Sequence, residues 1–190
     1  MGKRRTTKEQ LIKTAAELFL KRGYEKTTMR DLARIVGIQA PAIYNHFKNK
    51  KEILVHIHKQ SREIFRENVI EEMKKIREPQ ERIKLFIRRL IQYQVSLGEM
   101  VFILDDTIPR YYLKGKKEII DETFHLVRDT LAELAEQGRL KTGIDPTVAA
   151  FALIGMITRV YKWYDPKGRL GAEELAEQTV QLFFKGFKGT

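Results

Sequence analysis

Apolar residues recur at helical spacing along almost the whole chain, and no stretch shows a sustained alternation of apolar and polar residues. Residues 29–36 are a clear example, because Met29, Leu32, Ala33 and Val36 stand at positions i, i+3, i+4 and i+7. β-Strands with one buried face require the alternating pattern instead. The sequence therefore predicts an all-α protein.

Capping residues, glycines and prolines mark the ends of about nine predicted helices. Thr7 and Gln10 fit a capping box, and Gly23 after the first helix is expected to fold Tyr24 back onto Phe19. The predicted helices cover about residues 7–22, 28–36, 39–47, 49–75, 79–93, 99–106, 116–137, 146–164 and 172–187.

The composition excludes several classes of protein. The 190 residues include no cysteine, which rules out disulfides, zinc–thiolate sites and cysteine nucleophiles and favours a reducing compartment. The long apolar run at 148–157 is well short of the roughly 20 residues that span a bilayer, and the N-terminus does not resemble a signal peptide. We therefore expect a soluble cytoplasmic protein.

The positive charge of the chain is concentrated in its first third. Residues 1–66 contain 16 Lys and Arg against 6 Asp and Glu, a net charge of +10, whereas residues 67–190 contain 20 against 19, a net charge of +1. A block of positive charge this local is typical of a module that meets a polyanion, with nucleic acid the first candidate and an anionic membrane surface the second.

Residues 28–47 within this basic third fit a helix-turn-helix. Two short predicted helices are separated by a turn at Gly37 and Ile38, and Ile43 and Phe47 form the inner side of the second one. In this motif the second helix enters the major groove of DNA. We therefore predict a DNA-binding domain at residues 1–48 and a second domain at residues 49–190.

Side chains suited to reading bases lie on the outer side of the second helix. Gln and Asn can bond adenine through two hydrogen bonds, and small apolar groups can touch a thymine methyl group. Hydroxyl, ammonium and guanidinium groups nearby are expected to meet phosphates. The candidate DNA-binding residues are Thr28, Arg30, Gln39, Ala40, Pro41, Ala42, Tyr44, Asn45, His46, Lys48 and Lys50.

The basic N-terminal residues Lys3, Arg4 and Arg5 leave two interpretations open. They fit an arm that reaches a neighbouring minor groove, as in some helix-turn-helix proteins, and they fit equally well a solvated tail.

The segment TTMRDLARIVGIQAPAIYNHFKNKKEIL, with FLKRGYEKTT before it, resembles the DNA-binding module of TetR-type transcriptional regulators. The resemblance covers about residues 6–60. It implies a three-helix DNA-binding domain followed by a larger helical domain for ligand binding and dimerisation. The sequence departs from the family at Gln39, where Ser or Thr is usual, and at Pro41, where Gly or another small residue is usual.

The last two predicted helices favour a homodimer. Residues 146–164 are apolar over most of the helix circumference, and residues 172–187 repeat apolar and small residues on one side. Two such helices bury more surface than one chain can cover, and pairing with a second copy gives a four-helix bundle. The alternative is an ordinary monomer core.

The helices from 79 to 164 are expected to enclose a pocket for a small-molecule effector. Aromatic and apolar residues are candidate lining, although core packing is the alternative for each. Arg159 interrupts an apolar helix, and its partner is a ligand anion, a carboxylate across the dimer or solvent at the rim. The candidate ligand-binding residues are Phe86, Leu90, Tyr93, Phe102, Phe124, His125, Arg128, Met156 and Arg159. No metal site and no cofactor is predicted.

The C-terminal 45 residues resemble TetR-type regulators that sense fatty acyl-CoA, on the matching residues Trp163, Tyr164, Pro166 and Gly168. This implies an acyl-CoA or fatty-acid effector. An efflux-type regulator that senses a drug-like or aromatic compound is the alternative. With either effector, the prediction is a homodimeric repressor that binds a palindromic operator and is released by its ligand.

An enzyme is not expected. The sequence has no HExxH, GxSxG, P-loop or dinucleotide-binding glycine pattern. His56 and His58 are two residues apart, so on one helix they cannot bind a metal together.

Overall fold

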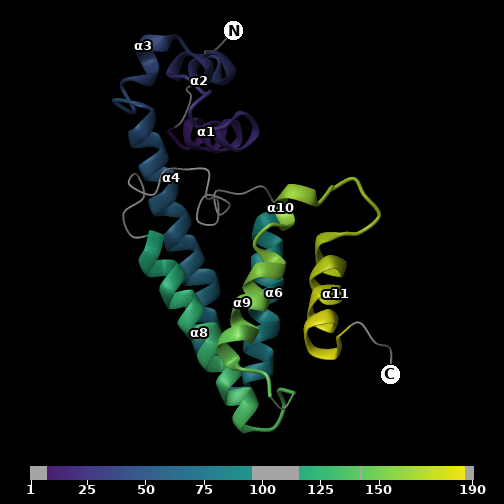
Figure 1. Ribbon diagram of the computed structural model, residues 1–190. Helices are drawn as coiled ribbons and strands as arrows, with labels where there is room; N and C mark the ends of the chain where they lie inside the picture. The colour runs from purple at the N-terminus through teal and green to yellow at the C-terminus, as the bar shows by residue number, and fades with distance from the viewer. Residues whose placement is uncertain (1–7, 96–115, 142, 187–190) are drawn as a thin grey trace. The chain divides into compact units, whose positions relative to one another are not determined.

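The computed structural model describes residues 8–95, 116–141 and 143–186, and the regular elements in these ranges are all helical, which confirms the predicted all-α class (Figure 1). The chain divides by its contacts into two compact units. Of the described residues, unit 1 holds 8–62 and unit 2 holds the rest. The division falls inside the helix α4 (Lys50–Phe65), whereas the sequence predicts a boundary before residue 49.

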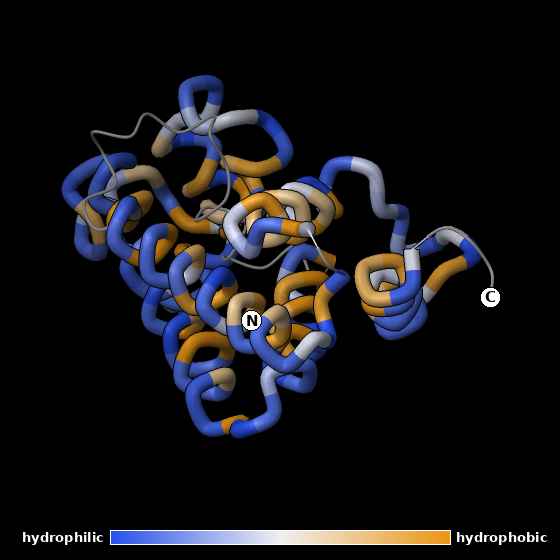
Figure 2. The backbone as a smooth tube through the Cα atoms, turned by 60° about the horizontal axis from the view of Figure 1, so that its bottom comes forward, coloured by the Kyte–Doolittle hydropathy of each residue, from blue (hydrophilic) through white to orange (hydrophobic). Residues whose placement is uncertain are grey.

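Unit 1 is a small helical domain with a closed apolar core. It consists of α1 (Lys8–Arg22), α2 (Met29–Val36), α3 (Ala40–Ile43) and the first turns of α4. The tube in Figure 2 changes between hydrophobic and hydrophilic colours within single turns, as expected for amphipathic helices. The buried core residues are Leu11, Ile12, Ala15, Ala16, Leu18, Phe19, Tyr24, Leu32, Ala33, Ile43, Phe47, Ile53, Leu54 and Ile57.

The turn between α1 and α2 has the predicted form. Gly23 adopts a left-handed conformation with φ of 87°, and the Tyr24 ring packs edge-on against Phe19 with 5.1 Å between centroids. Lys50 anchors this turn to the start of α4, because its Nζ donates to the Tyr24 carbonyl at 2.6 Å and lies 4.1 Å from the Tyr24 ring centroid. Thr27 Oγ1 donates to the Gly23 carbonyl at 2.9 Å.

Both ends of α2 are capped. Asp31 N donates to Thr28 Oγ1 at 3.1 Å, and Thr28 N donates to Asp31 Oδ2 at 3.1 Å, which completes a capping box. At the other end, Gly37 has φ of 76°, and Ile38 N donates to the Ala33 carbonyl at 2.9 Å. These caps fix where α2 ends and the turn toward α3 begins.

The helix predicted over 39–47 is shorter in the structure. The α-helical residues are only Ala40–Ile43, and tighter turns follow, in which Asn45 N donates to the Ala42 carbonyl and His46 N to the Ile43 carbonyl. Pro41 lies in the first turn, where its missing N–H costs nothing. These three-residue hydrogen bonds wind the segment more tightly than an α-helix, and α4 starts soon after it.

The predicted long helix over 49–75 is one continuous helical stretch with a π-helical turn. It consists of α4, the π-helix η1 (Arg66–Ile70) and α5 (Glu71–Lys75). Asn49 Oδ1 accepts the Glu52 N–H at 2.9 Å at the start of α4. The Asn68 amide donates to the Ile64 carbonyl at 2.9 Å beside the π-turn.

Unit 2 is built around α6 (Pro79–Val95). This helix contacts α8 (Lys116–Glu136), α9 (Pro146–Ile157), η1, α5 and α11 (Ala172–Lys185). Its buried side includes Ile83, Phe86, Ile87, Leu90 and Ile91. Within the described ranges, no helix is long and apolar enough to cross a membrane.

Arg82 holds the turn before α6 against α8. Its guanidinium donates to both carboxylate oxygens of Glu133 at 2.7 Å each, and its Nε donates to the Ile76 carbonyl at 2.9 Å. Further bonds reach Thr130 Oγ1 and the Arg77 carbonyl. A bidentate pair of this kind fixes geometry as well as charge, so α6 and α8 keep one register.

The helix predicted over 146–164 is broken in the structure. It forms α9 and the short α10 (Val160–Trp163), separated at Thr158 and Arg159. The buried Gln94 of α6 stabilises the break, because its amide donates to the Ile157 carbonyl and its Oε1 accepts the Tyr161 N–H at 3.3 Å. Asp145 caps the start of α9 by accepting the Thr147 N–H at 2.7 Å.

The predicted helix at 99–106 and the Thr7 capping box lie outside the described residues. The last helix ends at Lys185, and Gly186 follows it with φ of 76°.

The capping box of α2 predicts a pH-dependent stability. The hydrogen bond from the Thr28 side chain, followed by the Thr28 N–H, lowers the pKa of Asp31 below its ordinary value of 3.8. A lowered pKa stabilises the folded state above pH 3.8, and this stabilisation is lost as the pH falls through the lowered pKa. We therefore expect Asp31→Asn to lower the melting temperature at pH 7 and to converge on the unsubstituted protein as the pH falls below about 4.

The measurement is thermal unfolding by circular dichroism at a series of pH values. Glu9→Gln on α1 is the control, since it removes an exposed carboxylate at the start of a helix without touching a capping box. If the difference in melting temperature between the Asp31→Asn protein and the unsubstituted protein stayed constant from pH 7 to pH 3, this role for the carboxylate would be contradicted.

Candidate nucleic-acid interface

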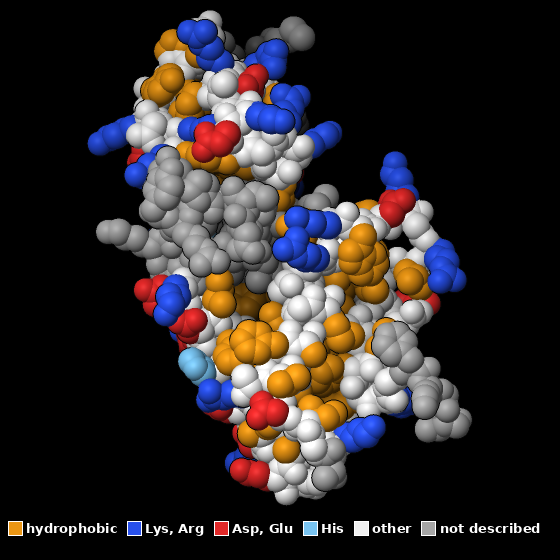
Figure 3. Space-filling model, viewed as in Figure 1, with side chains coloured by type: hydrophobic (Ala, Val, Ile, Leu, Met, Phe, Trp, Pro, Cys, Tyr) orange, Lys and Arg blue, Asp and Glu red, His pale blue; other side chains and the backbone are white. Residues whose placement is uncertain are grey.

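The predicted DNA-binding residues of unit 1 lie near the start of α2 and along α3 and the turns after it. Most of their side chains are exposed, including Tyr44 at 53%. Lysine and arginine side chains are visible over the part of Figure 3 that contains α1, α2 and α3. The exposed members are Thr28, Arg30, Gln39, Pro41, Tyr44, Asn45, His46 and Lys48.

Gln39 precedes α3 and exposes its side chain. It is the N-cap residue, but its side chain makes no capping hydrogen bond. The hydroxyl oxygen of Ser or Thr at an N-cap normally accepts a hydrogen bond from a backbone N–H in the first turn of the helix. The Gln39 amide therefore keeps its donors and its acceptor for another partner.

Besides Thr28, which caps α2, other candidates contribute to unit 1 itself. Ala40 and Ala42 are half-buried, and Ala40 packs against the core. Lys50 is half-buried, with its ammonium bonded to the Tyr24 carbonyl. Lys48 is exposed, and only its backbone N–H is engaged, with Glu52 Oε2 at 2.6 Å. The predicted arm residues Lys3, Arg4 and Arg5 lie outside the described residues.

The candidate ligand residues of unit 2 fall into three groups. Phe86 and Leu90 are buried in the core. Tyr93 and Phe124 are half-buried, with the Phe124 ring 4.6 Å from the Phe151 ring of α9 between centroids. His125, Met156 and Arg159 are exposed. Phe102 lies outside the described residues.

The polar candidates of unit 2 differ in their surroundings. Arg128 is half-buried and pairs with Asp129 at 2.6 Å. Burial raises the pKa of Tyr93, and the nearby Arg89 acts against this shift by a smaller amount. Arg159 lies at the break between α9 and α10 as the N-cap residue of α10. The structure thus brings Phe124 to α9 but does not gather the nine candidates around one described cavity.

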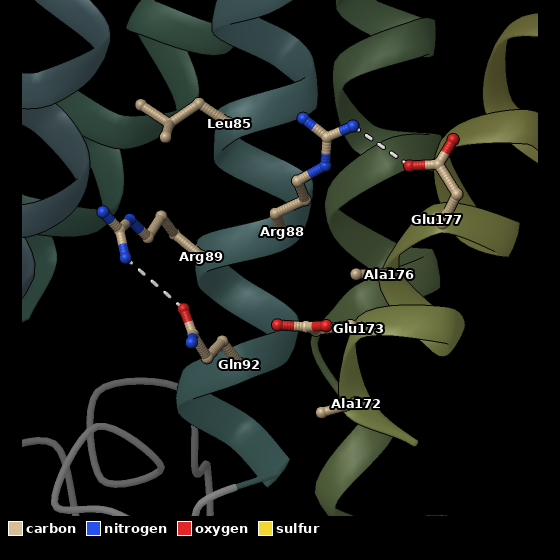
Figure 4. Close-up of a pocket in the computed structure, with 8 residues that line it drawn as sticks. All are labelled: Leu85, Arg88, Arg89, Gln92, Ala172, Glu173, Ala176 and Glu177. Atoms are coloured by element: carbon tan, nitrogen blue, oxygen red, sulfur yellow. Dashed lines mark hydrogen bonds and ion pairs between the residues drawn. The ribbon is translucent and has the colours of Figure 1, made fainter. Parts of the chain in front are cut away.

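A groove that the sequence analysis did not anticipate lies between α6 and α11 (Figure 4). Its volume is about 470 Å³, and none of the candidate ligand residues lines it. The sequence signal was available, because Leu85, Arg88, Arg89 and Gln92 follow the i, i+3, i+4, i+7 pattern of one helix face. The lining residues are Leu85, Arg88, Arg89, Gln92, Ala172, Glu173, Ala176 and Glu177.

The described part of the chain contains no group of three or more His, Cys, Asp or Glu placed to hold a metal ion.

Two relatives match nearly the full chain. The fatty acid metabolism regulator protein of Bacillus subtilis (strain 168) is 23% identical over 190 residues, which cover 98% of each chain. The HTH-type transcriptional repressor KstR2 of Mycolicibacterium smegmatis (strain ATCC 700084 / mc(2)155) is 23% identical over 187 residues, covering 94% of this chain and 89% of the relative.

Among solved structures, AibR in complex with isovaleryl coenzyme A and operator DNA is similar over almost its whole length. It is 28% identical, and the match covers 95% of this chain and 99% of AibR with a TM-score of 0.83. The likeness therefore extends over both units of the chain.

Two family profiles match the chain in succession. Residues 11–57 match the bacterial regulatory proteins of the tetR family, and residues 77–187 match the Tetracyclin repressor-like C-terminal domain. The first covers the helix-turn-helix of unit 1, and the second covers more than half of the chain. The family resemblance seen in the sequence is confirmed, and the chain belongs to the TetR family of DNA-binding transcriptional regulators, which are not enzymes.

Proposed function

We propose that this TetR-family regulator is a cytoplasmic homodimeric repressor that binds a palindromic operator and leaves it when a small effector binds unit 2. The observation that carries the proposal is the exposed polar surface at the two ends of α3, where Gln39 precedes the helix and Tyr44 and Asn45 follow it, all three outside the core. The major-groove edges of bases supply hydrogen-bond donors and acceptors that are complementary to these side chains.

The exposed residues divide into two roles in this proposal. Gln39, Asn45 and His46 face base edges. Thr28, Arg30, Tyr44 and Lys48 contact phosphates, which set the register of α3 in the groove. Lys50 contributes differently, because its ammonium is bonded to the Tyr24 carbonyl and so holds the turn that orients α2.

An exposed apolar surface on α9 supports a homodimer. The buried side of α9 includes Leu153 and Ile157, yet Val148 and Phe151 on its other side are 63% and 65% exposed, and Met156 is 42% exposed. Figure 3 shows hydrophobic side chains gathered in this region of unit 2. A helix that is apolar on both sides packs against protein on both sides, and α9 and α11 of a second copy would bury the exposed side.

Phe151→Glu tests this interface. A carboxylate placed in an apolar dimer surface loses its hydration on association, so we expect the variant to elute as a monomer at concentrations at which the unsubstituted protein is dimeric. The measurement is size-exclusion chromatography with light scattering. Val55→Glu on α4 is the matched control, because Val55 is an exposed apolar residue of unit 1 at 43%. A Phe151→Glu protein that kept the dimer mass would contradict the proposed interface.

An acyl-CoA is the effector class that the comparisons support best. AibR has been solved with isovaleryl coenzyme A, and the Bacillus subtilis relative is named for fatty acid metabolism. In this chain, Tyr93, Phe124, His125, Arg128, Met156 and Arg159 are the candidate contacts, and Phe86 and Leu90 support them from the core. A drug-like or aromatic effector of an efflux-type regulator is the alternative.

The coupling between effector and DNA follows from the continuous helix over residues 50–75. Its first turns belong to the core of unit 1, and its later turns belong to unit 2. An effector changes DNA affinity only to the extent that it binds one conformation of the dimer better than the other. We propose that it favours a spacing of the two α3 helices that departs from the roughly 34–36 Å of successive major grooves.

The test uses a DNA duplex selected by the protein from a random pool. Fluorescence anisotropy then measures its affinity with isovaleryl-CoA, with coenzyme A alone and with a hydrophobic cation as an efflux-type ligand. We expect isovaleryl-CoA to weaken binding at least fivefold, within the usual range of allosteric coupling, and coenzyme A alone to have a smaller effect.

The outcomes separate the two effector classes. Release by the hydrophobic cation and not by the thioester would replace the acyl-CoA effector with the efflux-type one. If the affinity for the selected duplex were the same with all three compounds, control of DNA binding by these ligands would be contradicted. If the protein selected no duplex from the pool, its proposed role as a DNA-binding repressor would be contradicted.

A further inference from the structure

The groove between α6 and α11 is a concave region of unit 2 that none of the candidate effector residues lines. One wall is a stripe of α6 with two arginines, and the other is a stripe of α11 on which alanine and glutamate alternate (Figure 4). Its volume of about 470 Å³ lies within the range of small-molecule sites.

Two alanines keep the groove open. Ala172 and Ala176 line it from α11, while the neighbouring Leu175 and Val180 are buried and hold α11 against the rest of unit 2. Larger side chains at the alanine positions would fill the space. The helix packing therefore leaves a hollow with an apolar lining at Ala172, Ala176 and Leu85.

The charges of the groove are unevenly matched. Arg88 Nη2 pairs with Glu177 at 3.0 Å and joins the two walls. Arg89 points away from this pair in Figure 4, and its Nη1 makes only a long hydrogen bond to Gln92 Oε1, at 3.4 Å. Within the described ranges, no carboxylate forms an ion pair with Arg89. The pKa of the nearby Glu72 is lowered mainly by the hydrogen bond that it accepts from Lys75 at 2.6 Å, and to a smaller extent by the charge of Arg89.

The Nε–H of Arg89 is the least satisfied group of the groove. The nitrogen is buried and has no hydrogen-bond acceptor among the described residues. A buried donor without an acceptor is costly, and the cost is larger for a charged group. A ligand oxygen that accepted the hydrogen bond from this Nε–H would remove the cost.

We propose that this groove binds a small organic carboxylate, with the carboxylate on Arg89 and an apolar body along Leu85, Ala172 and Ala176. The planar guanidinium offers Nε–H and an Nη–H as a fork that matches two carboxylate oxygens. Glu173 on the opposite wall disfavours ligands with a second negative charge. This site is independent of the operator and of the acyl-CoA effector, so its test needs neither.

The probe is benzoate, titrated into the full-length protein and followed by the Nε–H resonances of its arginines in 1H–15N spectra. We expect one Nε–H resonance, assigned to Arg89 by its loss in the Arg89→Gln protein, to shift with a saturable dependence on benzoate. Benzamide has nearly the same shape without the charge, so it should cause little shift.

Substitutions on the two walls have opposite expected effects. The affinity for benzoate should fall at least about tenfold in Arg89→Gln, the usual loss for a charge-assisted hydrogen bond. The rise in melting temperature on adding benzoate gives a second measure of this affinity. It should strengthen in Glu173→Gln, which removes the opposing charge. Ala172→Leu should abolish it by filling the groove. Arg77→Gln is the control, since it removes one positive charge from the exposed turn before α6, outside the groove.

Three results would overturn the proposal: no saturable shift with benzoate, equal shifts with benzoate and benzamide, or equal affinity in the unsubstituted and Ala172→Leu proteins. Ala172→Leu keeps every charge, so it tests the site even if the Arg89→Gln protein folds poorly.

Discussion

The DNA-binding unit depends on the burial of the first turns of α4. Ile53, Leu54 and Ile57 are fully buried in the core that also holds α1, α2 and α3. Each such side chain contributes on the order of 1.5–3 kcal/mol when it leaves water, so α3 cannot keep its position without α4. The same helix continues through η1 and α5 into unit 2. The helix that completes the DNA-binding core is therefore also the covalent connection to unit 2, through which the proposed effector would act on α3.

Local signals predicted unit 1 well because its turns are set by single residues. Gly23 and Gly37 have the left-handed backbone that glycine tolerates, and Thr28 caps the start of α2 together with Asp31. The exposed Gln39 and Asn45 could likewise be placed from helical periodicity alone. The length of α3 could not, because its end is set by three-residue hydrogen bonds that follow from the short connection to α4.

Long-range polar contacts account for what the sequence did not predict in unit 2. The break between α9 and α10 depends on Gln94, which is 63 residues away in the sequence from the carbonyl to which it donates. Hydrophobic periodicity predicts helices but cannot predict a hydrogen bond between residues so far apart. The groove between α6 and α11 arises from two stripes about 80 residues apart in the chain. Phe86 and Leu90 illustrate the same difficulty, because an apolar stripe predicts burial but does not say whether a cavity or the core lies beside it.

The proposed function requires that two copies of this chain bind one DNA site through their α3 helices. Native mass spectrometry of the full-length protein with a duplex selected from a random pool tests it most directly, since it reports the number of protomers and duplexes together. The account predicts a complex of two protomers and one duplex on a palindromic sequence, weakened when Asn45 is replaced by alanine. A single protomer on the DNA, or a complex that Asn45→Ala and other changes on α3 leave unaltered, would contradict it.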